Sequence, residues 1–167
     1  MYLADDVMAV TKAPLTCLIV DDSAFMRFHL RRMMDSFEGV IASEAANGNE
    51  AIREYGRLKP DIVLMDIVMP GMEGVETVKR ICDTDPAARV IMISSLSYKE
   101  KVAEAMAAGA KWFIPKPVTT EELRRAIESV LAAPSAGSPA CPNASPDMSP
   151  DVSLGVSPYV SRDVSQM

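Results

Sequence analysis

Between residues 14 and 132 the chain alternates short β-branched apolar runs with longer stretches whose apolar residues recur at helical spacing. Five such repeats follow one another, which is typical of strand–helix units around a parallel sheet. The predicted strands are Leu15–Val20, Val40–Glu44, Ile62–Met65, Val90–Ile93 and Trp112–Ile114. The predicted helices are Ser23–Ser36, Asn49–Leu58, Val75–Thr84, Tyr98–Ala108 and Glu121–Leu131. Right-handed crossovers then favour an α/β fold with a doubly wound sheet, which binds ligands outside the carboxyl ends of its strands.

Local signals agree with these helix ends. Ser97 with Glu100, and Thr119 with Glu122, have the spacing of a capping box, in which a hydroxyl and a carboxylate satisfy free backbone N–H groups. Gly109 follows the fourth predicted helix, where a left-handed residue would end it. The pattern therefore predicts where helices start and stop as well as how many there are.

The segments on either side differ from this domain. Residues 1–13 form an N-terminal extension, and residues 134–167 contain eight serines, six prolines and a single basic residue. A segment of this composition buries too little apolar area to offset the entropy cost of ordering, so we predict a disordered tail over 133–167. The alternative is a short docking segment made of the apolar residues between the serines, Val152, Leu154, Val156, Tyr159, Val160 and Val164.

Composition excludes several classes of function. The net charge of −6 and sequence pI near 4.8 argue against nucleic acid or an anionic membrane surface as the main partner, because both select for clustered lysine and arginine. No secretory signal and no apolar run of membrane-spanning length is present in the sequence. The three cysteines, Cys17, Cys82 and Cys141, lie far apart and predict neither disulfides nor a zinc site. We therefore expect a cytoplasmic protein without membrane insertion or nucleic-acid binding.

Polar residues cluster directly after the predicted strands. Because parallel strands end at the same edge of a sheet, residues that follow the first, third, fourth and fifth strands open into one crevice. Those residues are Asp21 and Asp22, Asp66, Ser94 and Ser95, and Lys116. The sequence thus predicts one site made of acidic, hydroxyl and basic groups.

Three carboxylates in such a crevice repel one another, by roughly 3 kcal/mol per pair at about 5 Å and an effective dielectric constant near 20. A hard divalent cation with oxygen ligands would offset this repulsion, and Mg²⁺, which keeps waters for a phosphate, fits better than calcium. Lys116 and Ser94 suit the oxygens of a phosphoryl group. A carboxylate nucleophile beside Mg²⁺ is suitable chemistry for an aspartyl phosphate.

Each residue also has an ordinary structural explanation. Asp22 could lie near a helix N-cap, and Asp66, before Met69-Pro70-Gly71, could be a turn former. Ser94 could be a loop hydroxyl and Lys116 a solvated amine. These explanations would have to coincide at four matching strand ends.

With these residues in place, the segment from about 14 to 132 resembles bacterial response-regulator receiver domains. The motifs that agree in order and spacing are Leu18-Ile19-Val20-Asp21-Asp22-Ser23, Asn47-Gly48-x-Glu50-Ala51, Asp61-x-x-Leu64-x-Asp66-x-x-Met69-Pro70-x-x-x-Gly74, Ala108-Gly109-Ala110, and Lys116-Pro117 with Glu122-Leu123. The stretches 22–27 and 93–97 look most like the stand-alone chemotaxis type.

The resemblance implies a flavodoxin-like (βα)5 sheet of order 2-1-3-4-5 with Asp66 as the phosphoacceptor. It implies that Asp21, Asp22, Asp66 and the backbone carbonyl of Val68 hold Mg²⁺. A sensor histidine kinase would supply the phosphoryl group. The downstream partner would be a protein, such as a flagellar motor switch or a phosphorelay carrier.

The resemblance also implies a conformational switch. Ser94 falls at the switch hydroxyl, Lys116 at the phosphate-binding lysine and Phe113 at the aromatic switch position, and the Lys116–Pro117 peptide is expected to be cis. Phosphorylation would draw Ser94 inward and let Phe113 fill the vacated space, which changes the surface around the fourth helix and fifth strand. Alternatively, Phe113 is only a core aromatic.

Some residues depart from the family pattern. Pro115 interrupts the last strand, which is tolerable at a sheet edge. Phe113 lacks the tyrosine hydroxyl of many chemotaxis members. Val68 offers no polar side chain to orient an attacking water, which predicts a comparatively long-lived aspartyl phosphate.

The sequence therefore predicts a single-domain response regulator without a DNA-binding output domain, which phosphorylates and dephosphorylates itself but is not otherwise an enzyme. Three alternatives stay open. The first is a Mg²⁺-dependent phosphatase or phosphotransferase that uses Asp66 or Asp21 as nucleophile on an external substrate, although neither aspartate has the Asp-x-Asp spacing of such enzymes and a cap domain is missing. The second is a phosphorelay or phosphate-sink receiver, and the third is an interaction module with an inactive site.

Overall fold

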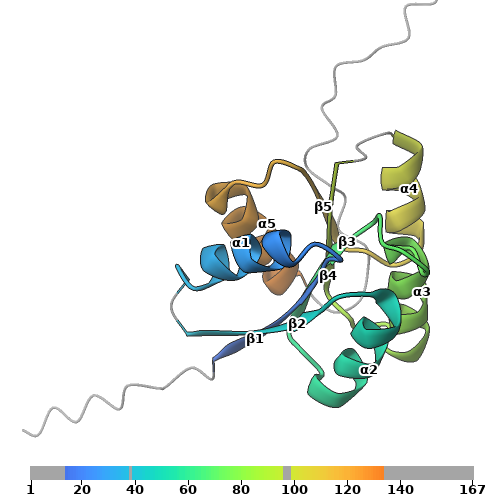
Figure 1. Ribbon diagram of the computed structural model, residues 1–167, viewed down its shortest axis with the longest axis horizontal. Coiled ribbons are helices and arrows are strands. Elements are labelled where there is room, and N and C mark those ends of the chain that lie inside the picture. Colours follow the sequence, from blue (N-terminus) through green and yellow to red (C-terminus); the bar gives the residue numbers. More distant parts are fainter. Residues whose placement is uncertain (1–13, 38, 96–98, 134–167) are drawn as a thin grey trace, which may run out of the picture.

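The computed structural model describes residues 14–37, 39–95 and 99–133, and the fold alternates strand and helix along the chain (Figure 1). The strands are β1 (Leu15–Val20), β2 (Val40–Ala45), β3 (Ile62–Asp66), β4 (Val90–Ser94) and β5 (Trp112–Pro115). The helices are α1 (Ala24–Met34), α2 (Gly48–Leu58), α3 (Gly74–Thr84), α4 (Lys99–Ala107) and α5 (Thr120–Ala132). All ten predicted elements are present, and their ends lie within two residues of the prediction.

The five strands form one parallel sheet in the order β2-β1-β3-β4-β5, as predicted. Val20 at the end of β1 pairs with Met65 of β3, and Asp66 pairs with Ile93 of β4. Ser94 in turn pairs with Pro115 of β5. This register brings the carboxyl ends of β1, β3, β4 and β5 to the same edge of the sheet, and it places Pro115 in an edge strand, where a missing N–H is tolerated.

Helices cover both faces of the sheet, with α1 and α5 on one face and α2, α3 and α4 on the other (Figure 1). Because side chains alternate along a strand, each strand feeds two separate cores. In β3, Ile62 and Leu64 pack with α1 and α5, whereas Val63 and Met65 pack with α2 and α3. The continuous apolar runs of β3 and β4 follow from this burial on both faces.

Several local expectations can be compared with the structure. Thr119 and Glu122 form a capping box at the start of α5, and Gly109, with φ of 113°, lies just beyond the end of α4. The Lys116–Pro117 peptide is cis, as predicted. Ser97, predicted to cap α4, lies outside the described residues, and so do the N-terminal extension, Cys141 and the apolar residues of the tail.

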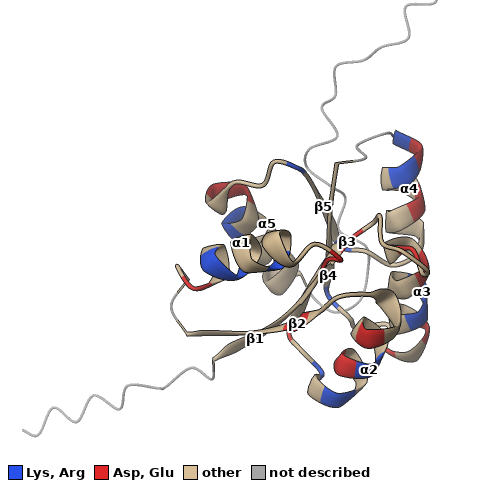
Figure 2. Cartoon of the chain, viewed as in Figure 1, with Lys and Arg blue, Asp and Glu red and all other residues tan. Residues whose placement is uncertain are grey.

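Helices α2, α3 and α4 each carry acidic and basic side chains, as Figure 2 shows. Within the described residues, no helix is long and apolar enough to cross a membrane. The sheet itself brings a different set of charged residues together. These are Asp21, Asp22 and Asp66, at the carboxyl ends of β1 and β3.

Candidate functional site

Three aspartates meet at the carboxyl edge of the sheet. Asp21 follows β1 directly, Asp22 is the next residue, and Asp66 ends β3. One carboxylate oxygen from each lies within 4.8 Å of the other two. Asp21 and Asp66 are buried, whereas Asp22 is exposed at the mouth. The site therefore has acidic walls and one side open to solvent.

Lys116, which directly follows β5, reaches two of these aspartates. Its Nζ donates a hydrogen bond to Asp21 Oδ2 at 2.9 Å and another to Asp66 Oδ1 at 3.1 Å. Burial alone would lower the pKa of Lys116, but its hydrogen bonds and attraction to the two carboxylates outweigh burial and raise that pKa. Lys116 is therefore a fixed positive charge inside the acidic site.

The pKa of Asp66 is set mainly by its burial. Burial raises its pKa above the ordinary value, the nearby Lys116 partly offsets this effect, and the charge of Asp21 adds to it. A buried carboxylate held against a cation has few water molecules to lose before it reacts. The site thus holds a partly dehydrated carboxylate, which is a group that can act chemically as a nucleophile.

The loop after β1 is held by its own hydrogen bonds. The Asp21 N–H donates to the Ala45 carbonyl of β2 at 3.3 Å, and Asp21 Oδ1 accepts from the Ser23 N–H at 2.8 Å. Ser23 is the N-cap of α1, and its hydroxyl accepts from the Met26 N–H. The cap of α1 is therefore Ser23, and the side chain of Asp22 remains available to the site.

The other predicted residues lie in β4, in β5 and in the loop after β3. Ser94 is fully buried at the end of β4, and its backbone carbonyl accepts from the Lys116 N–H at 2.9 Å. Phe113 is half-buried and packs against the core on the α2, α3 and α4 side. Val68, two residues after Asp66, is 55% exposed. The structure thus brings Asp21, Asp22, Asp66 and Lys116 together, with Ser94 beside them.

Comparison with known proteins agrees with this geometry. Residues 17–128 match the family model described as the response regulator receiver domain. The chain belongs to the response regulator receiver family.

Known receivers resemble this chain over most of their own length. The chemotaxis protein CheY of Thermotoga maritima is 45% identical over 113 residues, which are 68% of this chain and 94% of that protein. CheY of Bacillus subtilis is 40% identical over 114 residues, covering 68% of this chain and 95% of that protein. A solved CheX–CheY–BeF3–Mg²⁺ complex from Borrelia burgdorferi matches with a TM-score of 0.68 and 38% identity, covering 72% of this chain and 92% of the matched chain.

The donor set of this receiver fits a magnesium ion. The three aspartates offer hard oxygen atoms close enough to share one cation, and one open side leaves room for the water or phosphate ligands that Mg²⁺ retains. The repulsion between the two buried carboxylates, Asp21 and Asp66, is roughly 3 kcal/mol at an effective dielectric constant of about 20, and a divalent cation would offset it together with Lys116. The residues that would hold it are Asp21, Asp22 and Asp66, and the backbone carbonyl of Val68 stays a prediction from the resemblance.

Sequence reasoning missed two features that shape this receiver. Gly74 begins α3 beside the end of β3, and a Cβ at this position would overlap the backbone carbonyl oxygen of Asp66. Arg27 of α1 donates hydrogen bonds to the backbone carbonyls of Asp21 and Asp22. A signal for Arg27 existed, because a cation in the first turns of a helix is unfavourable beside the helix dipole unless another group holds it.

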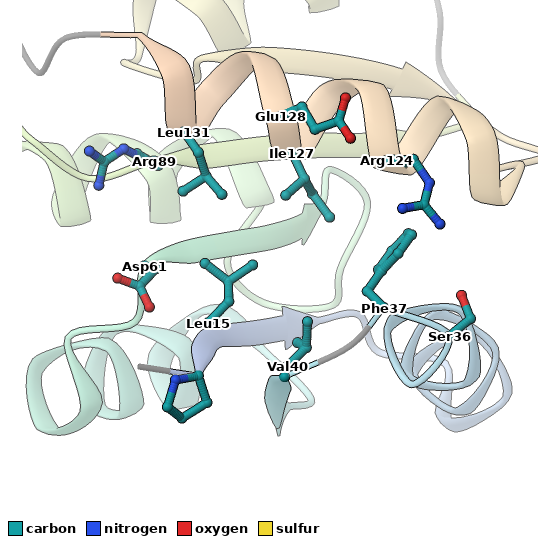
Figure 3. A pocket seen from close by; sticks show the side chains of 12 residues that line it. Leu15, Ser36, Phe37, Val40, Asp61, Arg89, Arg124, Ile127, Glu128 and Leu131 are labelled. Atoms are coloured by element: carbon teal, nitrogen blue, oxygen red, sulfur yellow. The ribbon is translucent and has the colours of Figure 1, made fainter. Parts of the chain in front are cut away.

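A groove of about 1020 Å³ lies at the opposite edge of the sheet (Figure 3). It lies between the start of β1, at Leu15, and the second half of α5, at Ile127 and Leu131, and Arg124 stacks over the ring of Phe37 there. Leu15 is the first residue of β1 and Asp21 follows its last, so the groove and the acidic site lie at opposite ends of the same strand.

Proposed function

We propose that this receiver takes a phosphoryl group on Asp66 from a sensor histidine kinase, in a reaction that depends on Mg²⁺. The observation that carries this proposal is the cluster of Asp21, Asp22 and Asp66, whose carboxylate oxygens lie within 4.8 Å of one another, with Lys116 hydrogen-bonded to Asp66. A bound Mg²⁺ would neutralise the carboxylates and the developing charge on the phosphoryl oxygens.

The chain's own groups divide the work of transfer. A carboxylate oxygen of Asp66 attacks phosphorus, and the bond from phosphorus to the donor histidine nitrogen breaks, with its electron pair returning to the imidazole. In this proposal Lys116 exchanges its hydrogen bonds to Asp21 and Asp66 for hydrogen bonds to the phosphoryl oxygens. Ser94, at the end of the neighbouring strand β4, would donate a hydrogen bond from its hydroxyl to a phosphoryl oxygen.

We further propose that phosphorylation changes the surface formed by α4, β5 and α5. Ser94 lies two residues beyond Met92 in β4, and Phe113 is the strand partner of Met92, so Ser94 and Phe113 are on one face of the sheet. That face is the one covered by α4 (Figure 1). Movement of Ser94 toward a phosphate would therefore change the packing of Phe113 and α4, on the same face of the sheet, rather than that of α1 on the other face.

The downstream partner in this proposal is a protein, such as a flagellar motor switch or a phosphorelay carrier, and the receiver works in the cytoplasm. The CheY relatives support this, because the chain covers 94–96% of their length in the first four comparisons. The exposed Phe25 and Val68, close in sequence to Asp22 and Asp66, offer apolar contacts to a phosphodonor at the mouth of the site.

Incubation with acetyl phosphate and Mg²⁺ tests the transfer. Intact-mass measurement should show one phosphoryl group on the wild type and none on Asp66→Asn. The matched control is Asp83→Asn, because Asp83 is an exposed aspartate of α3, and this variant should react like the wild type. Phosphorylation of Asp66→Asn, or continued hydrolysis of a small phosphomonoester by the wild type, would contradict the proposal and favour a phosphatase.

Beryllofluoride with Mg²⁺ tests the switch. Amide NMR shifts should change in α4, β5 and α5 of the wild type, and Ser94→Ala should reduce those changes while still binding the ligand. Shift changes confined to the site itself would count against a role of Ser94 and Phe113 in signalling.

A further inference from the structure

Arg27 of α1 holds the loop that carries the first two aspartates. Its Nη1 donates to the Asp21 carbonyl oxygen at 2.8 Å and to the Asp22 carbonyl oxygen at 3.3 Å. Its backbone N–H donates to the Ser23 carbonyl oxygen at 3.0 Å. This backbone bond is the first intrahelical bond of α1, so the Arg27 side chain itself engages two consecutive carbonyls of the loop.

Glu44 of β2 holds this arginine in place. Arg27 Nε donates to Glu44 Oε2 at 3.1 Å, and Arg31, one turn further along α1, contacts Glu44 Oε1 at 3.3 Å. The Arg27 side chain is 17% exposed. Because the guanidinium is planar, the bond to Glu44 on one edge fixes the direction of the N–H groups that reach the loop.

We infer that Arg27 is a positioning residue for the divalent cation of this site, and that Glu44 acts through Arg27. This inference rests on the proposed function, since the ion is the one that phosphoryl transfer would use. Arg27 contacts only the backbone of the two aspartates, so it orders their carboxylates without competing for them.

The two aspartates differ in how much they need this support. Asp21 has side-chain hydrogen bonds of its own, from the Ser23 N–H and from Lys116. The side chain of Asp22 is exposed, so the backbone sets its direction. Loss of the Arg27 contacts should leave Asp22 free to turn away, and binding of the ion would then have to restore its position.

The charge of Arg27 acts in the opposite direction. A positive charge near the site repels Mg²⁺, so removing it should tighten binding if long-range charge were its main effect. Positioning predicts weaker binding instead. The sign of the change therefore separates the two effects.

Calorimetric titration of the metal-free full chain with Mg²⁺ measures this directly. Arg27→Gln should weaken binding about tenfold, equivalent to about 1.4 kcal/mol, and Arg27→Lys should recover part of the loss because an ammonium group still reaches a carbonyl. Glu44→Gln should weaken binding about threefold, and the double variant should match Arg27→Gln. Arg57→Gln is the control, because Arg57 pairs with Glu54 on α2, away from the loop.

Urea unfolding in EDTA accompanies each titration, because a merely structural residue would change the free energy of unfolding but not the Mg²⁺ dissociation constant of the folded protein. An Arg27→Gln dissociation constant within twofold of the wild type would overturn the inference. If Arg27→Gln does not fold, Glu44→Gln decides, and unchanged binding by that variant overturns it. If the wild type is phosphorylated and Arg27→Gln binds Mg²⁺ normally, this inference is refuted and the proposed function stands. If the wild type neither binds Mg²⁺ nor becomes phosphorylated, the proposed function is refuted as well.

Discussion

Replacing Lys116 by methionine would remove the cation that holds two buried carboxylates together. Asp21 is 1% exposed and Asp66 6% exposed, and Lys116 is hydrogen-bonded to both. Methionine keeps much of the apolar stem without its charge. The substitution leaves two negative charges close together and without their shared partner, so we expect a less stable protein when no divalent cation is present.

The magnitude follows from the distances. At 2.9 Å and 3.1 Å, each attraction is worth about 5 kcal/mol at an effective dielectric constant near 20. Much of this is offset by the cost of dehydrating the lysine, and breaking a buried ion pair typically costs about 3–5 kcal/mol. Because the site is open on the Asp22 side, we expect the lower value, a loss of about 3 kcal/mol in the free energy of unfolding.

Added Mg²⁺ should reverse much of this loss. A ligand that binds only the folded state stabilises it by about 2.7 kcal/mol at 100 times its dissociation constant. In the wild type Mg²⁺ must compete with Lys116 for Asp21 and Asp66, whereas in Lys116→Met it does not. We therefore expect Mg²⁺ to bind about tenfold more tightly to the variant and to stabilise it by about 1.4 kcal/mol more at saturating concentrations.

Urea unfolding followed by far-UV circular dichroism, in EDTA and in Mg²⁺, measures both effects. Lys79→Met is the matched control, because Lys79 is an exposed lysine of α3. A loss below about 0.5 kcal/mol for Lys116→Met in EDTA, the range of ordinary surface substitutions, would refute the reasoning. Equal stabilisation of wild type and variant by Mg²⁺ would show that Lys116 does not compete with the ion.

Three further predictions follow from other contacts. Gly74→Ala should destabilise the fold by about 3 kcal/mol in urea unfolding, because its Cβ would overlap the Asp66 carbonyl; a loss under 1 kcal/mol would contradict this. Tyr55→Phe should cost about 1 kcal/mol at neutral pH through the lost hydrogen bond to Asp85. This hydrogen bond is the main cause of the lowered pKa of Asp85. The stabilisation from the bond is therefore present above the unfolded-state pKa of about 4 and is lost as the pH falls through the folded-state pKa. Equal acid sensitivity of the variant and the wild type would contradict this. Val68→Asn should shorten the lifetime of the aspartyl phosphate several-fold in a dephosphorylation time course, because an amide at this exposed position orients an attacking water; an unchanged half-life would count against the hypothesis that valine prolongs it.

Hydrophobic periodicity predicts the order and type of every element, most clearly at the central strands β3 and β4, which are buried on both faces. In β3, the run from Ile62 to Met65 reads as continuous apolar sequence since its alternate residues enter two cores. The ends were less certain: α1 was predicted over 23–36, but the helix ends at Met34 with Asp35 as C-cap. No glycine or proline lies at that end, so the sequence offers little to mark it.

The candidate site was predictable for the groups that follow strands. Asp21, Asp66 and Lys116 directly follow or end β1, β3 and β5, and the parallel register alone brings them together. Arg27 and Glu44 were not predicted, because their pairing depends on how α1 lies against β2. That packing angle is a tertiary property, and the only local trace of it is a basic residue in an unfavourable position on α1.

Lys116 and Arg27 give this site two cations with opposite consequences for Mg²⁺. Lys116 donates to the carboxylates, so it occupies the oxygens that the ion would use. Arg27 donates to the backbone carbonyls of Asp21 and Asp22, so it leaves the carboxylate oxygens of both residues for the ion. Each neutral substitution removes one positive charge, and an explanation based on net charge alone requires both variants to bind Mg²⁺ more tightly. The geometry instead requires tighter binding by Lys116→Met and weaker binding by Arg27→Gln, so the pair of measurements tests whether position or total charge governs the ion.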